Sequence, residues 1–119
     1  MITKFGIILR KIRTNSGDSL RTCATKLGIT AAFLSSMEVG RKSIPNYYPQ
    51  KIKKIYNLAE EDYIELYNAM AETNKHVTIE VDTMNEAQKE ITLVFARQIN
   101  SANSKLIEKL KKALEEEDE

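Results

Sequence analysis

Tryptophan is absent from this sequence of 119 residues, and cysteine and histidine occur once each. The single cysteine, Cys23, excludes a disulfide within the chain and is typical of a protein from a reducing compartment. A multi-histidine metal site is excluded because His76 has no companion. Aromatic residues make up only 7% of the chain. The core is therefore expected to consist mainly of Ile, Leu, Val and Met.

Long apolar runs are also missing from the sequence. No segment approaches the roughly 18 consecutive apolar residues that are needed to span a bilayer. The N-terminal residues 1–13 interleave basic and apolar side chains at helical spacing, whereas a secretory signal has an unbroken apolar block and a small-residue cleavage site. We therefore expect a cytoplasmic protein that does not contact a membrane.

No set of residues assembles an obvious reaction centre. Cys23 falls at an apolar position of an expected helix, so we predict that it belongs to the core and is not a nucleophile. No glycine-rich phosphate loop follows a strand, and the carboxylates fall on predicted solvent faces and in the C-terminal tail. We expect no enzyme activity, and neither a cofactor nor a metal ion.

The charges nearly cancel, to +1, but they are unevenly distributed along the chain. Eleven of the 18 basic residues precede Asn57, against only two acidic residues, Asp18 and Glu38, which gives this part a charge of +9. The remainder has seven basic and fifteen acidic residues and carries −8. A basic front part favours a polyanionic partner, although such charge blocks also serve solubility alone.

Apolar residues recur at helical spacing through the first 73 residues and predict five helices. Thr3, Ser19 and Thr30 are residue types that cap the start of a helix, and Gly28 and Gly40 are suited to helix ends. The predicted helices comprise residues 3–15, 20–27, 31–39, a segment near 49–58, and 60–73.

The pattern changes after the fifth predicted helix. Residues 76–82 alternate with period two and are β-branched, which predicts a strand. Because a lone strand cannot satisfy its own backbone groups, its partner would be the same strand of a second copy; the alternative is a loop whose apolar residues pack on the helices. Two amphipathic helices, residues 85–99 and 104–115, favour packing or oligomerisation. The acidic residues 115–119 are expected to fray.

Residues 20–39 have the features that a helix-turn-helix requires. Ala24 is small enough to permit close approach of the two helices, and Gly28 is suited to the tight turn. Leu34 and Met37 are placed to anchor the second helix to the core. The outer face of that helix would then be free to enter the DNA major groove, although helical hairpins that do not bind DNA contain similar turns.

These segments resemble the phage-repressor (Cro/cI, XRE-like) family of helix-turn-helix transcriptional regulators. The resemblance is carried by KLGIT (residues 26–30), by FLSSMEVGRK (residues 33–42) and by Pro45, and it extends from Thr3 to about Met70.

The resemblance implies a mainly all-α fold with two parts. Residues 1–73 would form a five-helix, lambda-repressor-like DNA-binding domain. Residues 74–119 would form an extension, the strand and two helices, that serves dimerisation or another interaction.

The resemblance also assigns roles to individual residues. In the family, an arginine near the end of the first helix forms an ion pair with the glutamate that ends the recognition helix, and these positions are Arg13 and Glu38 here. The recognition helix would be residues 31–39. The implied base or groove contacts are Thr30, Ala31, Ala32, Ser35 and Ser36, and the implied phosphate contacts are Ser19, Arg21, Arg41 and Lys42.

The base-reading positions depart from the family's pattern because they all carry small side chains. Alanine can contact only a thymine methyl group, and serine discriminates poorly between bases. Leu20 and Asp18, close to the expected DNA backbone, are further departures. Specificity could come from DNA shape with half-site spacing, or from long side chains at the rim. The third outcome is a domain that has exchanged DNA binding for protein recognition.

We expect a homodimeric repressor, of phage, prophage or autoregulatory type, that binds a palindromic operator in double-stranded DNA. One module buries too little surface for tight binding, so dimerisation through the C-terminal strand and helices would raise the affinity. The alternative is a protein-interaction module, such as an antitoxin or a phage-encoded inhibitor of a host defence complex that retains the helix-turn-helix. Its acidic C-terminal part would suit a basic protein partner.

Overall fold

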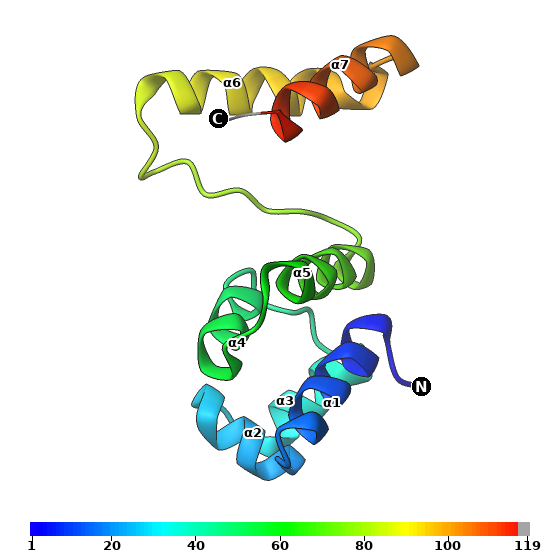
Figure 1. Cartoon of the computed structure of the whole chain (residues 1–119), viewed down its shortest axis with the longest axis vertical. Helices are drawn as coiled ribbons and strands as arrows, with labels where there is room; N and C mark the ends of the chain where they lie inside the picture. Colours follow the sequence, from blue (N-terminus) through cyan, green and yellow to red (C-terminus); the bar gives the residue numbers. More distant parts are fainter. Residues whose placement is uncertain (117–119) are drawn as a thin grey trace. The chain divides into compact units, whose positions relative to one another are not determined.

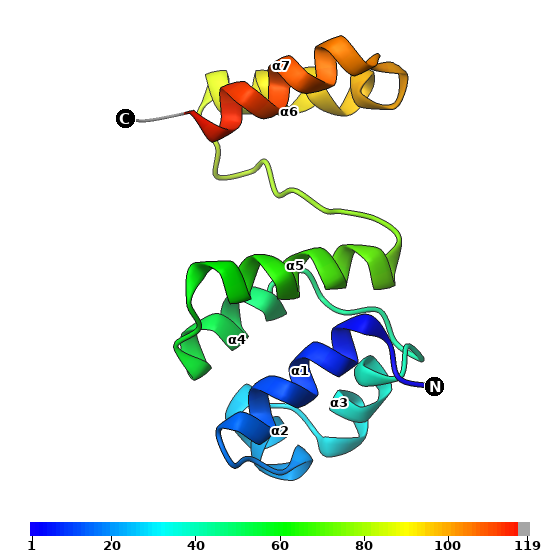
Figure 2. The same ribbon diagram turned by 45° about the vertical axis from the view of Figure 1, so that its right-hand side comes forward.

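The computed structural model describes residues 1–116 and is mainly helical, which confirms the predicted fold class at that level (Figures 1 and 2). The chain divides into two compact units, Met1–Thr78 and Ile79–Glu119. The elements in chain order are α1 (Lys4–Asn15), α2 (Leu20–Leu27), α3 (Ala31–Glu38), α4 (Tyr48–Tyr56), α5 (Glu60–Asn74), α6 (Glu86–Gln98), the 3-10 helix η1 (Ile99–Ser101) and α7 (Ser104–Glu115).

The first unit consists of α1 to α5 around one apolar core. Helix α1 packs against α3 and α5, and α2 packs against α3 and α4. All of the buried hydrophobic residues in the described part of the chain belong to this unit: Phe5, Leu9, Cys23, Ala24, Leu27, Leu34, Met37, Ile44, Tyr48, Ile52, Leu66, Ala69 and Met70. This core fixes α3 against α1 and α2.

Side-chain caps determine where the first three helices begin. The hydroxyl oxygens of Thr3, Ser19 and Thr30 accept hydrogen bonds from the backbone N–H groups three residues further on, at 3.0, 3.1 and 3.0 Å. Each cap satisfies one of the N–H groups that a helix leaves free at its start.

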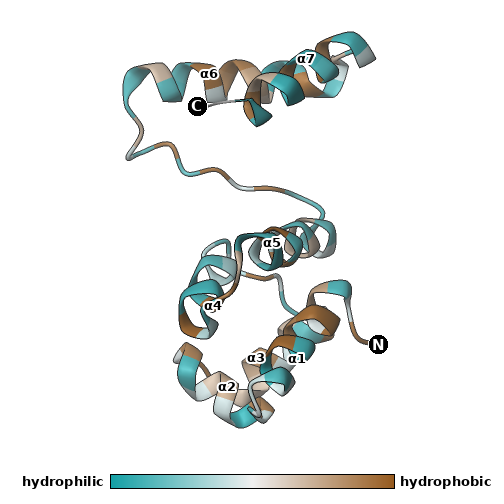
Figure 3. Ribbon diagram, in the orientation of Figure 1, coloured by the Kyte–Doolittle hydropathy of each residue, from teal (hydrophilic) through white to brown (hydrophobic). Residues whose placement is uncertain are grey.

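The second unit contains α6 and α7, which form a helical hairpin. Asn85 and Gln88 form a reciprocal capping box at the start of α6, and the Asn103 side chain caps α7. Teal and brown alternate along both helices in Figure 3, as expected for amphipathic helices. Of the tail expected to fray, residues 117–119 lie outside the described residues. Within residues 1–116, no helix has the length and apolar character needed to cross a membrane.

The prediction of a strand at residues 76–82 is wrong. Residues 1–116 contain no strand, and residues 76–81 form an irregular connection that leads into a turn before α6. A β-branched alternating pattern cannot supply ladder hydrogen bonds, because these depend on a neighbouring strand. Ile79 lines a groove on the α6–α7 hairpin, but it is 51% exposed and Val77 is 57% exposed. The alternative, a loop whose apolar residues pack on the helices, is therefore met only in part.

Candidate nucleic-acid interface

The turn between α2 and α3 consists of residues 28–30. Gly28 has a left-handed backbone (φ +75°), and the Ile29 N–H donates to the Ala24 carbonyl at 3.0 Å, so α2 ends there. The Lys51 ammonium group on α4 also donates to the Leu27 carbonyl at 2.7 Å. A cation at the C-terminus of a helix is favourable for its dipole, and this contact holds α4 against the end of α2.

Helix α3 has a buried face and a more accessible one. Leu34, Met37 and Glu38 are buried. On the opposite side Ala32 is exposed, and Ser35 and Ser36 are half-buried. The side chains that the sequence implied for the groove therefore lie mostly on the face that points away from the core.

Two of the implied groove residues have additional structural roles. The exposed Thr30 is the N-cap of α3, and its hydroxyl accepts from the Phe33 N–H. Ala31 is half-buried and packs against the core, so less of its methyl group is accessible than that of Ala32. At 100° per residue, Val39, the C-cap of α3, falls between Ser35 and Ala32 on the helix surface. Val39 was not among the predicted groove contacts.

The four implied phosphate contacts, Ser19, Arg21, Arg41 and Lys42, are all exposed. Ser19 caps α2 by accepting from the Thr22 N–H. The other N–H groups of a first helical turn have no partner within the helix, so they can bind an anion. The N–H groups of Arg41 and Lys42 donate to the Ser36 carbonyl at 2.9 and 3.3 Å. The chain after α3 thus turns back over the end of the helix. In the sequence, Ser19 and Arg21 precede α3, and Arg41 and Lys42 follow it.

Glu38 lies at the end of α3 and pairs with two arginines of α1. Arg13 Nε lies 3.3 Å from Glu38 Oε2, and Arg10 Nε lies 3.3 Å from Oε1. The Glu38 side chain is 2% exposed and that of Arg13 is 11% exposed, whereas that of Arg10 is 50% exposed. The pair that the family resemblance implied is therefore present and is the more buried of the two. Arg10 was not predicted as a partner of Glu38.

The backbone of Glu38 is bound to α1 as well. The N–H and the hydroxyl of Thr3 both donate to the Glu38 carbonyl, at 2.9 and 3.0 Å. Next to this contact Gly6 has no space for a side chain, because a Cβ atom there would lie 2.2 Å from the Glu38 carbonyl oxygen. Both ends of α1 thus determine the position of the end of α3.

The negative charge of Asp18, which departs from the family's pattern close to the expected DNA backbone, is compensated by neighbouring side chains. Its carboxylate accepts from the Lys26 ammonium group and from the Tyr56 hydroxyl, each at 2.7 Å. The hydrogen bond from Lys26, followed by that from Tyr56, lowers the pKa of Asp18 below its usual value. Burial is the main cause of the raised pKa of Tyr56. The sequence offered no local signal for this network, because Tyr56 is 38 residues away from Asp18.

Cys23 lies in the core of the first unit, where the sequence reading placed it. Its side chain is fully buried, and burial is the main cause that raises the pKa of its thiol. A buried, protonated thiol is a weak nucleophile.

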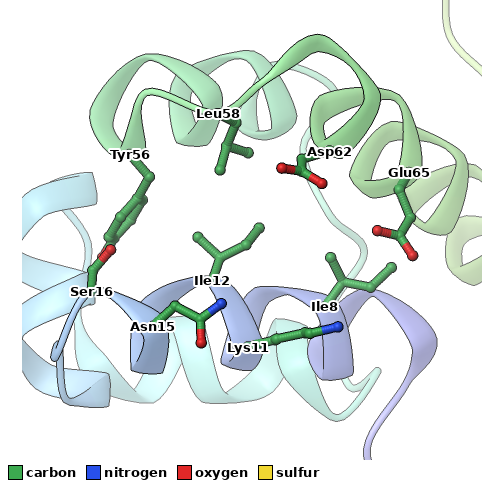
Figure 4. A pocket seen from close by; sticks show the side chains of 9 residues that line it. All are labelled: Ile8, Lys11, Ile12, Asn15, Ser16, Tyr56, Leu58, Asp62 and Glu65. Atoms are coloured by element: carbon green, nitrogen blue, oxygen red, sulfur yellow. The ribbon is translucent and has the colours of Figure 1, made fainter.

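A pocket of about 250 Å³ lies between α1 and the α4–α5 region (Figure 4). Ile12 and Leu58 point toward each other across it, while Lys11, Asp62 and Glu65 contribute charged groups to its wall. Its volume is below the range of roughly 300–1,000 Å³ that is typical of small-molecule sites. None of the residues implied for DNA contact lines it.

Comparison of the chain with protein-family models, with curated proteins and with solved structures gave no match.

Proposed function

We propose that this chain is a transcriptional regulator of the phage-repressor (Cro/cI, XRE-like) type, which docks α3 in the major groove of double-stranded DNA. One observation carries the proposal: α3 has an accessible face, and the segments directly before and after it in the chain carry an exposed helix N-terminus at Ser19 and exposed cations at Arg21, Arg41 and Lys42. Phosphate groups border the major groove on both sides, so a reading helix needs anion-binding groups around it.

The net charge of the first unit supports the same partner. Residues 1–78 contain twelve basic and seven acidic side chains, which gives +5. Two acidic groups near the helix-turn-helix are engaged by cations, Asp18 by Lys26 and Glu38 by Arg13. The positive side chains around α3 are therefore less opposed by nearby free carboxylates, which favours attraction to a polyanion.

The small side chains of α3 determine how the groove would be read. Ala32, Ser35 and Ser36 let the helix backbone approach the base edges closely, but they offer few discriminating hydrogen bonds. Most of the specificity would then come from DNA shape and from the spacing of two half-sites. The regulator would be a homodimeric repressor with a lambda-repressor-like DNA-binding unit.

The test is selection from a randomised duplex library at two salt concentrations, with plain competitor DNA present. We expect a palindromic motif and an affinity that falls steeply as salt rises. Arg41→Ala should weaken binding similarly for all sequences and reduce the slope of log affinity against log salt by about 1. Lys109→Ala removes the same charge from α7 and serves as the matched control. Absent or sequence-blind binding of the parent protein would contradict the proposal.

One observation favours a second candidate function. The implied base-reading positions carry no long polar side chain, so α3 also suits a protein surface. In that case the chain would be a protein-interaction module, such as an antitoxin or a phage-encoded inhibitor of a host defence complex. Two results together would favour this function over the first. The parent protein would select no DNA motif from the library, and it would capture a partner protein in pull-downs that the Ala32→Arg variant no longer captures.

A further inference from the structure

An apolar groove runs along the α6–α7 hairpin of the second unit. It has a volume of about 540 Å³, and every residue that lines it is uncharged, with Thr92 and Gln98 as the polar members. Its large apolar residues include Ile91, Val94, Phe95, Leu106, Leu110 and Leu114.

The hairpin does not bury this groove by itself. None of residues 79–116 is buried, and Ile91 and Leu114 are 62% and 74% exposed. An isolated unit of this size has too little core to be stable without additional support. Two ordered helices with their apolar sides open therefore require a further surface to cover them.

The apolar stripes are wider than one helix–helix contact needs. At about 100° per residue, the stripe of α6, continued by its C-cap Ile99, spans roughly 140° from Val94 to Ile99. The stripe of α7 from Ala113 to Ile107 spans roughly 120°. A narrow seam suffices for two helices, whereas helices of a bundle carry wider faces because each contacts two neighbours. The hairpin provides each helix with one neighbour only.

We infer that the groove is covered by the hairpin of a second copy of this chain, which completes an intermolecular four-helix bundle. Charge supports this occupant: residues 86–115 contain six basic and four acidic side chains, and none of these lines the groove. A mixed, nearly balanced rim neither repels an identical hairpin nor selects a partner of opposite charge. The acidity of the C-terminal half is thus not a property of this surface.

The geometry of a two-fold pair is also consistent with self-association. A two-fold axis uses the same patch on both copies, so this one groove suffices. This pairing does not depend on DNA binding, but it would join two first units as a palindromic operator requires.

The test measures the oligomeric state of the full chain without DNA, by sedimentation velocity over a range of concentrations. We expect a dimer for the parent and a dissociation constant at least about 100-fold higher for Ile91→Lys, because the variant would bury an unpaired charge at the interface. Leu93→Lys is the matched control. Leu93 lies on the same helix and is 47% exposed, but it does not line the groove, so this variant should remain dimeric.

Both substitutions replace exposed side chains outside the core of the first unit, so the parent thermal unfolding transition should persist in each. Leu114→Lys provides a second groove variant on α7 and should raise the dissociation constant to a similar extent. A parent protein that is monomeric throughout the concentration range would overturn the inference. A dimer that tolerates Ile91→Lys and Leu114→Lys would overturn it as well. Because DNA is absent from the assay, failure of the pairing is distinguished from failure of DNA binding, which the library selection measures separately.

Discussion

Glu38 is the one buried charged residue in residues 1–116, and it is fully provided with partners. Its carboxylate oxygens contact Arg10 and Arg13, and its carbonyl accepts two hydrogen bonds from Thr3. Removing a carboxylate from water costs several kcal/mol unless partners compensate. The stability of the first unit should therefore depend on how well each arginine shields this group.

The two arginines should contribute unequally. We expect Arg13→Ala to lower the free energy of unfolding by about 3 kcal/mol, because it removes the more buried partner of a buried carboxylate. Arg10→Ala should cost about 1 kcal/mol or less, because half of the Arg10 side chain is in solvent. Urea denaturation of both variants measures the difference. Equal losses, or an Arg13→Ala variant as stable as the parent, would contradict the argument.

Asp18 should make stability depend on pH in the acidic range. Its pKa is lowered from 3.8 by Lys26 and Tyr56, so the folded state favours the charged carboxylate. This contribution is present above the unfolded pKa and is lost as the pH falls through the folded one. Asp18→Asn should thus be less stable than the parent at neutral pH, and the two unfolding free energies should converge on acidification. Urea titrations over that pH range, with Asp82→Asn as an exposed control, provide the measurement.

At the scale of elements, the contact between α1 and α3 depends on a missing side chain. Alanine is the better helix former by about 1 kcal/mol, so Gly6→Ala would stabilise an isolated α1. The added Cβ would instead meet the Glu38 carbonyl oxygen at 2.2 Å. Forcing atoms into such a contact costs on the order of 1–3 kcal/mol or more, so the clash should prevail.

We expect Gly6→Ala to destabilise the first unit by about 2 kcal/mol. The control is Gly17→Ala, where the backbone is left-handed but nothing lies within 4 Å, and where about 1 kcal/mol of conformational cost is expected. Thermal unfolding followed by circular dichroism distinguishes the two. A Gly6→Ala protein more stable than Gly17→Ala would show that α1 can shift away from α3 at little cost.

The helices could be predicted from the sequence because their signals are local. Ser19 and Gly28 lie at the two ends of α2, so its predicted limits coincide with those observed. Local signals could not decide whether residues 76–82 form a strand, because a strand depends on a partner that is distant in the sequence. The contacts of Lys51 with Leu27 and of Tyr56 with Asp18 were missed for the same reason, because they join residues 24 and 38 positions apart.

The candidate site was predictable to a different extent. The accessible face of α3 follows from periodicity, since Leu34 and Met37 are apolar at core spacing. The pairing of Arg13 with Glu38 came only from the family resemblance, because nothing in the spacing of 25 residues indicates a contact. The partial burial of Ala31 depends on how α3 is rotated against the core, which a helical pattern does not determine.

At the scale of the whole molecule, the two units differ in how they are stabilised. The buried hydrophobic residues in residues 1–116 all belong to the first unit, whereas the hairpin has none of its own. The first unit should fold without the hairpin. The hairpin should gain most of its stability from association.

Truncation after Thr78 tests this division of roles. We expect residues 1–78 to unfold cooperatively and to be monomeric, since the pairing surface is removed. Their affinity for a palindromic duplex should fall by about 10²–10⁴-fold, because the two half-sites would no longer be linked. Sedimentation velocity and a DNA titration of the truncated protein check both points. A truncated protein that is dimeric, or that binds as tightly as the full chain, would contradict them.

The attachment of Glu38 to both ends of α1 has a consequence for any ligand of α3. A helix held at its end by two ion pairs and by two hydrogen bonds to its last carbonyl cannot tilt or unwind unless α1 moves with it. The conformational entropy of α3 is therefore lost when the protein folds and not when a ligand binds. Binding to α3 should therefore resemble the docking of a rigid body, with little change in backbone order between the free and bound states.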